Sequence, residues 1–439
     1  MIYLRTFYLT TCLLAGHLLS AQSYTRWISG DTSDVTPAAW EGGLLLAGGG
    51  SDNDNAMRWM LQRAGGGDIL ILRASGSDGY NSYLFSELGV PVNSVETIRF
   101  NNASAAQDPY ILHRIATAEA VFFAGGDQYD YYTYWKDNAV ETAINRLLNE
   151  KRITIGGTSA GMAILGDAYY TPPNGSLTSA EGLSNPFHSN TAIIDKGNFL
   201  QAPFMTDVIT DTHYDQRARP GRHVVFLARL SAAHQLSMKG IACNEGTAVC
   251  VDTNGIARVF GEYPAYNEVA YFLKTNCQDE YLPEVLQSGT PLTWNRTQAA
   301  VKSCKVPGHP DGLHTFNLND WEQTEGGIWN NWYVQQGVLL AVQNTGPNCD
   351  LATPVKTPVV GLDGQIIPNP FQSGFRIAGV GDQPVHARLY DLAGRLVWDA
   401  ANANPLEVLH PGNILAGCYF LEVTQPERKQ VFRMVKTGE

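Results

Sequence analysis

The chain has 439 residues, of which 44% are hydrophobic and only 16% are charged. This composition is typical of a globular protein with a core, and the length exceeds one ordinary domain, so we expect two or three folded units. The formal net charge of −12 argues against nucleic acid as a partner.

The N-terminus predicts export. Arg5 precedes an apolar stretch over residues 7–19, and the small residues Ser20 and Ala21 follow it. This order is typical of a secretory signal peptide, which we expect to comprise residues 1–21. The stretch is too short to span a bilayer comfortably and no later segment is apolar for long enough, so no transmembrane segment is expected.

Export also determines how the cysteines are interpreted. Six remain after removal of the signal: Cys243, Cys250, Cys277, Cys304, Cys349 and Cys418. An even number in an oxidising compartment predicts disulfides rather than metal ligands, since no Cys-x-x-Cys or adjacent His pair is present. Cys243 and Cys250 flank a turn composition and are placed to bridge two strands, but the connectivity stays open. We expect neither a metal nor an organic cofactor.

The first part of the chain alternates between apolar strands and amphipathic helices. Strands are predicted at residues 43–50, 68–73, 95–100, 120–124 and 152–155, and helices at residues 54–63, 110–117 and 134–148. This alternation indicates an α/β fold with a mostly parallel sheet and helices on both faces. Glycine turns at residues 48–50, 125–128 and 156–161 all follow strands, so we expect them to meet at one edge of the sheet.

The remainder divides by composition. Residues 238–272 carry β signals that predict a hairpin or meander, and residues 278–346 form an irregular, Trp-rich segment interpreted as extra surface structure on the same domain, which would span residues 22–346. Residues 347–359 have a Pro- and Thr-rich linker composition. Short alternating strands over residues 360–439 predict a small C-terminal β-sandwich.

Ser159 is a candidate nucleophile. It lies in the run Gly-Thr-Ser-Ala-Gly over residues 157–161, where small neighbours allow a sharp strand-to-helix turn that exposes the hydroxyl. A serine hydroxyl needs a base, and His213 follows an apolar strand pattern at the same kind of position. Backbone amides of Ala160, Gly49 and Gly50 are expected to stabilise the oxyanion.

The acidic partner of His213 stays open at this level, among Glu181, Asp167, Asp211 and Asp195. Three arginines follow the histidine closely, namely Arg217, Arg219 and Arg222. In so acidic a chain they suggest recognition of a substrate carboxylate, or salt bridges that stiffen the wall of the site.

Three motifs together resemble the cyanophycinase and aspartyl-dipeptidase family of serine peptidases. They are Phe-Ala-Gly-Gly-Asp-Gln at residues 123–128, Gly-Thr-Ser-Ala-Gly at residues 157–161 and Asp-Thr-His with the arginines at residues 211–222. The resemblance covers about residues 43–275. It implies a flavodoxin-like domain related to class I glutamine amidotransferases, and hydrolysis of amide bonds involving aspartate in a peptide substrate.

By position, the resemblance implies Ser159 as nucleophile, His213 as base and Glu181 as third member. The implied substrate contacts are Gln128, Asp211, Thr212, Arg217, Arg219 and Arg222. Thr212 stands where the cyanophycinase pattern has glutamine, which replaces an amide with a shorter hydroxyl in the pocket. The resemblance therefore leaves cyanophycin, β-Asp-Arg and other aspartyl peptides open as substrates.

The C-terminal segment from about residue 360 resembles a type IX secretion sorting domain, through Pro-Asn-Pro-Phe at residues 368–371, Tyr-Asp-Leu-Ala-Gly-Arg at residues 390–395 and the strand pattern at residues 417–423. This implies the type IX machinery as a partner and a secreted or surface-attached location. Two alternatives remain, an α/β-hydrolase-type esterase and a non-catalytic surface-binding protein on a peptidase scaffold. The oligomeric state is not predicted.

Overall fold

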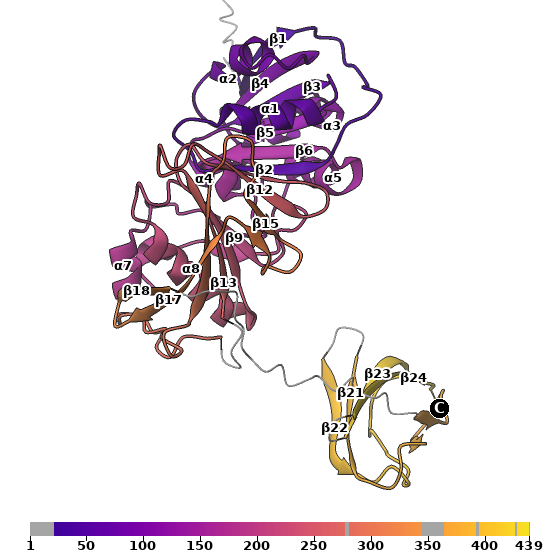
Figure 1. The fold of residues 1–439 in the computed structure, drawn as a ribbon. Coiled ribbons are helices and arrows are strands. Elements are labelled where there is room, and N and C mark those ends of the chain that lie inside the picture. The colour runs from indigo at the N-terminus through magenta and orange to yellow at the C-terminus, as the bar shows by residue number, and fades with distance from the viewer. Residues whose placement is uncertain (1–21, 277–280, 344–363, 392–394, 426–427, 439) are drawn as a thin grey trace, which may run out of the picture. The chain divides into compact units, whose positions relative to one another are not determined.

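The computed structural model describes residues 22–276, 281–343, 364–391, 395–425 and 428–438. The chain divides into two compact units, residues 1–349 with strands and helices and residues 350–439 with strands in their described part (Figure 1). The expected signal peptide (1–21) and the expected linker (347–359) lie outside the described residues. In the part of the chain that is described, no helix is both long and apolar enough to cross a membrane.

The first unit contains a ten-stranded mixed sheet with a parallel centre. In spatial order the parallel strands are β4 (Ser94–Phe100), β3 (Asp68–Arg73), β5 (Ala120–Phe123), β6 (Thr154–Thr158) and β2 (Gly43–Ala47). Antiparallel strands extend both sides: β1 (Tyr24–Gly30) next to β4, and β11 (Ala248–Val251), β12 (Ile256–Phe260), β15 (Thr315–Asn317) and β16 (Thr324–Glu325) beyond β2. The predicted α/β class with a mostly parallel central sheet is confirmed.

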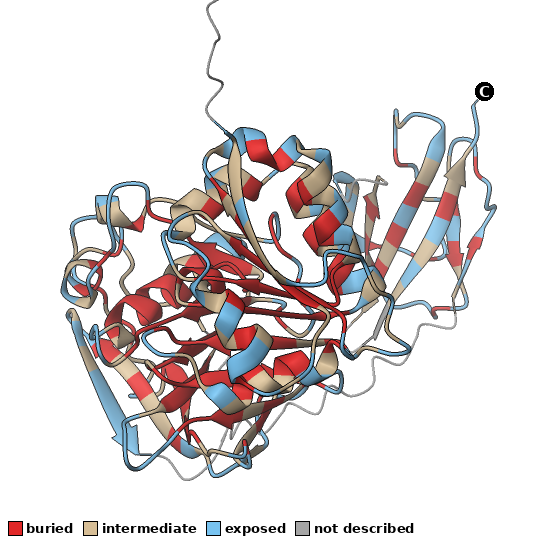
Figure 2. Cartoon of the chain, turned by 90° about the horizontal axis from the view of Figure 1, so that it is seen from above, coloured by how far each residue is buried: buried red, intermediate tan, exposed pale blue. Residues whose placement is uncertain are grey.

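Helices cover both faces of this sheet because alternate strand residues point to opposite sides. On one face Leu45 and Phe122 pack with Met57 and Met60 of α1 (Asp54–Arg63). The other face packs against α3 (Pro109–Thr117), α4 (Gln128–Trp135) and α5 (Ala139–Arg146). Figure 2 shows the strands between these layers as almost continuously buried.

The single helix expected over residues 134–148 is wrong. The structure has α4 and α5 instead, separated by Lys136, Asp137 and Asn138. Asp137 has a φ of +59°, and the Asn138 side chain accepts a hydrogen bond from the Val140 amide, which starts a new helix. A local cap therefore interrupts a pattern that is otherwise apolar at helical spacing.

A second, eight-stranded sheet completes the first unit. In spatial order it contains β18 (Val338–Gln343), β17 (Ile328–Gln335), β14 (Val301–Pro307), β13 (Val269–Thr275), β10 (Lys239–Cys243), β9 (Val208–Asp211), β7 (Ala168–Tyr170) and β8 (Ile194–Lys196). The short helix α7 (Ser179–Ser184) and the long helix α8 (Pro220–His234) connect its strands.

Two expectations about the later part of this unit are corrected. The Trp-rich segment is not surface decoration, because its strands extend both sheets and Trp294, Trp321, Trp329 and Trp332 are all buried. Cys243 and Cys250 are both free and buried. They do not flank a hairpin, since β10 belongs to the eight-stranded sheet and β11 to the ten-stranded sheet.

The second unit is all β in its described residues. A four-stranded antiparallel sheet has the order β22 (Leu396–Ala403), β21 (Val385–Tyr390), β23 (Gly417–Gln425) and β24 (Arg428–Lys436), and a two-stranded sheet contains β19 (Gln365–Ile367) and β20 (Arg376–Ala378). A separate apolar cluster that includes Phe371, Phe375 and Leu421 fills it. The additional C-terminal β region agrees with the predicted fold class.

Candidate active site

Ser159 lies at the end of β6, on a strained turn. Its backbone has a φ of +53° and a ψ of −116°, a conformation that L-residues rarely adopt, and it directly precedes the short helix α6 (Ala160–Ala163). A strand that ends in such a turn presents the side chain away from the sheet and the first helical amides toward the same space. The Ser159 amide donates to the Ala47 carbonyl at 3.1 Å, which fixes the turn against β2.

The structure brings His213 to this serine, as predicted. His213 Nε2 lies 2.7 Å from Ser159 Oγ, although the two residues follow strands of different sheets, β6 and β9. The imidazole is almost fully buried, with only 6% of the residue exposed. Burial is the main reason that the pKa of His213 lies below its ordinary value, and Arg217 and Arg219 lower it further. A neutral imidazole beside a serine hydroxyl is suited to accept its proton.

The acidic partner of His213 is Glu245, which the sequence did not single out. Its Oε1 lies 2.5 Å from His213 Nδ1, so the order of contacts is serine, histidine, glutamate. This hydrogen bond opposes the effect of burial by raising the pKa of His213. Glu245 is the second residue after β10, in the turn that leads the chain from one sheet to the other. Its position after a strand end is the signal that could have indicated it.

Glu181, the expected third member, is therefore corrected. Its carboxylate accepts from the backbone amide and the hydroxyl of Thr178, each at 2.9 Å, in a capping box at the start of α7. Asp167 is also engaged elsewhere, since it accepts from the Asp207 amide and forms an ion pair with Lys196. Neither carboxylate contacts His213.

The backbone carbonyls of residues 47–49, at the end of β2 and in the glycine turn after it, accept hydrogen bonds from the segments that carry Ser159, His213 and Glu245. The Ala47 carbonyl accepts from the Ser159 amide, the Gly48 carbonyl from the His213 amide at 2.8 Å, and the Gly49 carbonyl from the Gly246 amide at 3.1 Å. A β-carbon on Gly49, which has a φ of +97°, would lie 2.4 Å from the His213 ring. Only glycine fits there.

Gly49 and Gly50, the expected oxyanion donors, pack against the base and the acid, since a β-carbon on Gly50 would lie 2.9 Å from the Glu245 side chain. Their role as amide donors stays a prediction. A different glycine lies beside the nucleophile, because a β-carbon on Gly125 would be 3.6 Å from Cβ of Ser159. Ala160 begins α6 directly after Ser159, as expected.

The three arginines have different environments. Arg222 is 3% exposed and forms a two-point ion pair with Asp211, at 2.8 Å from Nε and 2.5 Å from Nη2. Asp211 is 2% exposed, and the neighbouring arginines hold the pKa of its carboxyl below the ordinary value against the effect of burial. The expectation that Asp211 and Arg222 contact substrate is therefore wrong, because the two side chains are buried and form an ion pair with each other.

Arg219 is partly exposed and Arg217 is exposed, while Thr212 between them and the strand is buried. Arg219 Nη1 donates to the Thr212 carbonyl at 2.8 Å and to its hydroxyl at 3.2 Å, so Thr212 orients this guanidinium. Burial lowers the pKa of Arg219 to about 10. Arg217 is exposed, and no described residue forms an ion pair with it. Gln128 begins α4 and donates to the Tyr170 carbonyl at 3.3 Å.

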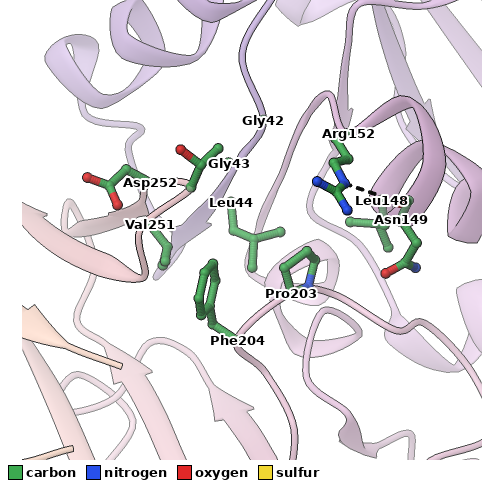
Figure 3. A pocket seen from close by; sticks show the side chains of 11 residues that line it. Gly42, Gly43, Leu44, Leu148, Asn149, Arg152, Pro203, Phe204, Val251 and Asp252 are labelled. Atoms are coloured by element: carbon green, nitrogen blue, oxygen red, sulfur yellow. Dashed lines mark hydrogen bonds between the residues drawn. The ribbon is translucent and has the colours of Figure 1, made fainter. Parts of the chain in front are cut away.

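A separate hollow of about 310 Å³ lies at the opposite edge of the sheet (Figure 3). It is lined by Gly43 and Leu44 at the start of β2 and by Arg152 just before β6, whereas Ser159 follows the other end of β6. The chemistry-bearing residues therefore do not lie in this hollow.

The fold and the contacts define an α/β protein with a Ser-His-Glu arrangement at the carboxyl ends of its strands, which is the arrangement of a serine hydrolase. Residues 78–259 match the model of Peptidase family S51, and this segment contains Ser159, His213 and Glu245.

Two cyanophycinases and one solved peptidase structure are similar to this chain. Cyanophycinase from Synechococcus elongatus is 27% identical over 228 residues, which are 50% of this chain and 66% of that protein. Cyanophycinase from Trichormus variabilis is 25% identical over 237 residues, covering 52% of this chain and 73% of that protein. The crystal structure of a peptidase from an acI-B1 Actinobacterium aligns with a TM-score of 0.38 at 16% identity, over 52% of this chain and 90% of the other. The family match and the cyanophycinase relatives support a serine-type peptidase.

Proposed function

We propose that the protein hydrolyses amide bonds of aspartyl peptides through an acyl-enzyme on Ser159. The observation that carries this proposal is the continuous contact from Ser159 Oγ through the His213 ring to Glu245, at 2.7 Å and 2.5 Å. Such a chain lets the histidine accept the serine proton while the carboxylate stabilises the resulting imidazolium.

In the proposed reaction Ser159 Oγ attacks the amide carbonyl carbon as His213 Nε2 takes its proton. The imidazolium then protonates the leaving amine as the carbon–nitrogen bond breaks. Water hydrolyses the ester in a second cycle with the same base. The Ala160 amide follows the nucleophile, and the Gly125 backbone lies beside it, so we assign these two as donors to the oxyanion.

The aspartyl specificity is proposed from charge and from the relatives. Arg217 is exposed near His213, whereas Arg219 is oriented by Thr212 and lies 3.6 Å from Asp211 Oδ1, so Arg217 is the guanidinium next to the base that is available to a substrate. A guanidinium binds a carboxylate well, which favours a substrate with an aspartate carboxylate close to the scissile bond. The cyanophycinase relatives suggest β-Asp-Arg as the first substrate to test.

The test is the variant Ser159→Ala assayed with β-Asp-Arg and a panel of aspartyl dipeptides. Loss of the attacking oxygen should reduce kcat by about 10⁴-fold or more, with the fold retained. Ser184→Ala is the matched control, because its hydroxyl only donates to the Glu181 carbonyl on the exposed side of α7. Full activity in Ser159→Ala would refute the mechanism, and turnover of short acyl esters but not of dipeptides would favour an esterase.

We also propose that the protein is exported and delivered to the cell surface. This proposal rests on the signal-like residues 1–21 and on the similarity of residues 360–439 to type IX sorting domains. An all-β unit with its own core at the C-terminus is compatible with an address that acts separately from the catalytic unit.

A further inference from the structure

The loop that carries His213 and the loop that carries Glu245 are joined by a reciprocal side-chain pair. Asp215 lies two residues after His213, and Asn244 lies one residue before Glu245. The Asp215 amide donates to Asn244 Oδ1 at 3.0 Å, and Asn244 Nδ2 donates to Asp215 Oδ2 at 3.0 Å. Each residue therefore donates to the other and accepts from it, which fixes the distance between the two loops.

The Asp215 carboxylate also accepts hydrogen bonds from two residues outside these two loops. Its Oδ2 accepts from Asn267 Nδ2 at 2.9 Å and from the Tyr271 hydroxyl at 3.0 Å. Tyr271 lies in β13, next to β10 in the sheet, so its hydrogen bond ties the carboxylate to this sheet. Burial and Asp215 both raise the pKa of the Tyr271 hydroxyl, which keeps it a donor.

Asn244 is fully buried, so its side-chain amide has few other hydrogen-bond partners within reach. It is 0% exposed, and its Nδ2 makes a second bond to the Asn267 carbonyl at 2.7 Å. Its own carbonyl lies against Gly48, where a β-carbon would approach it to 2.0 Å. A buried amide with all its partners in place has one orientation, and losing a partner leaves a polar group unsatisfied.

A weaker contact reinforces the same connection at the surface. The Glu245 amide donates to Gln216 Oε1 at 3.1 Å, and the Gln216 side chain is exposed. The backbone of Glu245 is thus held from one side by Gln216 and from the other by the Asn244 pair.

We propose that Asp215 is a positioning residue that holds Glu245 against His213 through its reciprocal pair with Asn244. This inference rests on the proposed function, because it assigns a role within the same catalytic contacts. Asp215 does not touch Ser159 or the imidazole in this arrangement. Its effect on catalysis is transmitted through the placement of the Glu245 carboxylate.

The first test is Asp215→Asn, which keeps the size of the side chain. If its nitrogen takes the place of Oδ2, it faces three donors and cannot accept from them, and if the amide flips, the charge that strengthens those bonds is lost. We expect kcat with β-Asp-Arg to fall roughly 10- to 100-fold while KM changes little, because the geometry of the catalytic groups and not substrate binding is disturbed.

The pH profile separates positioning from general loss of structure. The groups that face His213 are Glu245, which raises its pKa, and Arg217 and Arg219, which lower it. A loosened Glu245 should therefore lower the pKa of His213 and move the acidic limb of kcat/KM to lower pH. A merely structural role would reduce the active fraction and leave the limb in place.

A spectroscopic signature gives a readout independent of turnover. The proton between His213 Nδ1 and Glu245 should give a strongly downfield proton resonance in the wild type, and this resonance should shift or broaden in Asp215→Asn. Tyr271→Phe removes one bond to the same oxygen but leaves the Asn244 pair intact, so it should shift the acidic limb and the resonance less than Asp215→Asn does. Gln201→Ala changes an exposed side chain and is the control that should leave both unchanged.

If Asp215→Asn fails to fold, Gln216→Ala tests the same idea from the surface, with Gln201→Ala as an exposed control. Gln216→Ala should move the acidic limb of the kcat/KM profile to lower pH, by less than Asp215→Asn does. An unaltered limb and resonance in a folded Asp215→Asn, with Ser159→Ala inactive, would overturn this inference alone. Undiminished activity in Ser159→Ala would instead remove the proposed function on which it rests.

Discussion

At the scale of single residues, the role of Glu245 depends on one contact. Its carboxylate lies 2.5 Å from His213 Nδ1, while its side chain remains partly exposed. For His213 to accept a proton at Nε2, Nδ1 must carry the hydrogen, and a carboxylate accepts that hydrogen and so fixes the tautomer. Glu245 therefore keeps the hydrogen on Nδ1 and leaves Nε2 free to accept the serine proton.

The variant Glu245→Gln should lower kcat by about 10³- to 10⁴-fold, because an amide can donate to Nδ1 and favour the wrong tautomer. Steady-state kinetics with β-Asp-Arg measures the effect. Glu181→Gln is the control and should keep wild-type activity, since glutamine can also serve in the capping box of α7. If kcat fell in Glu181→Gln and not in Glu245→Gln, Glu181 would be the acidic partner of His213 after all.

At the scale of elements, the ion pair of Asp211 and Arg222 connects the end of β9 to the first turns of α8. Both side chains are almost fully buried, and Arg222 also donates to Ser176 Oγ at 2.6 Å. His213 lies two residues beyond Asp211, so this pair holds the strand end from which the base projects. Its contribution is to the framework of the site.

The variant Arg222→Met should lower the free energy of unfolding by about 3 kcal/mol, because it leaves the buried Asp211 carboxylate with only the longer ion pair to Arg219 Nη1, at 3.6 Å. Chemical denaturation measures this change. Arg217→Met provides the contrast, since Arg217 is exposed: stability should be nearly unchanged, while kcat/KM for aspartyl substrates falls. Equal stability of Arg222→Met and the wild type would contradict the structural role of the pair.

At the scale of the whole molecule, the two units have separate apolar cores. The clusters of the first unit use residues 44–334, and the cluster of the second uses residues 366–434. Each core can therefore form without the other. All of the proposed catalytic residues belong to the first unit.

A chain that ends at residue 349 should keep the kcat/KM and the melting temperature of the catalytic unit. In producing cells that possess type IX secretion, the same truncation should abolish delivery to the surface. Mass spectrometry of the full-length product should place its N-terminus at Gln22. Surface delivery of the truncated chain would contradict the sorting role of residues 350–439, and loss of activity would show that they support the site.

The sequence by itself determined the strands and turns that depend on neighbouring residues. Apolar runs predicted β2, β3, β5 and β6, and the small residues around Ser159 predicted its turn, because these features are local. The place of His213 after an apolar strand pattern indicated it as base, the resemblance of the motifs agreed, and the structure places it 2.7 Å from Ser159 Oγ.

Only the tertiary structure decided which distant side chains meet. Glu245 reaches His213 because β10 lies beside β9 in one sheet while β11 enters the other. Because β10 and β11 belong to different sheets, Cys243 and Cys250 do not lie on paired strands. Arg222 is buried and pairs with Asp211, whereas the sequence predicted that it contacts substrate. Pairing between strands distant in sequence depends on the packing of the whole core, which no local pattern of residues specifies.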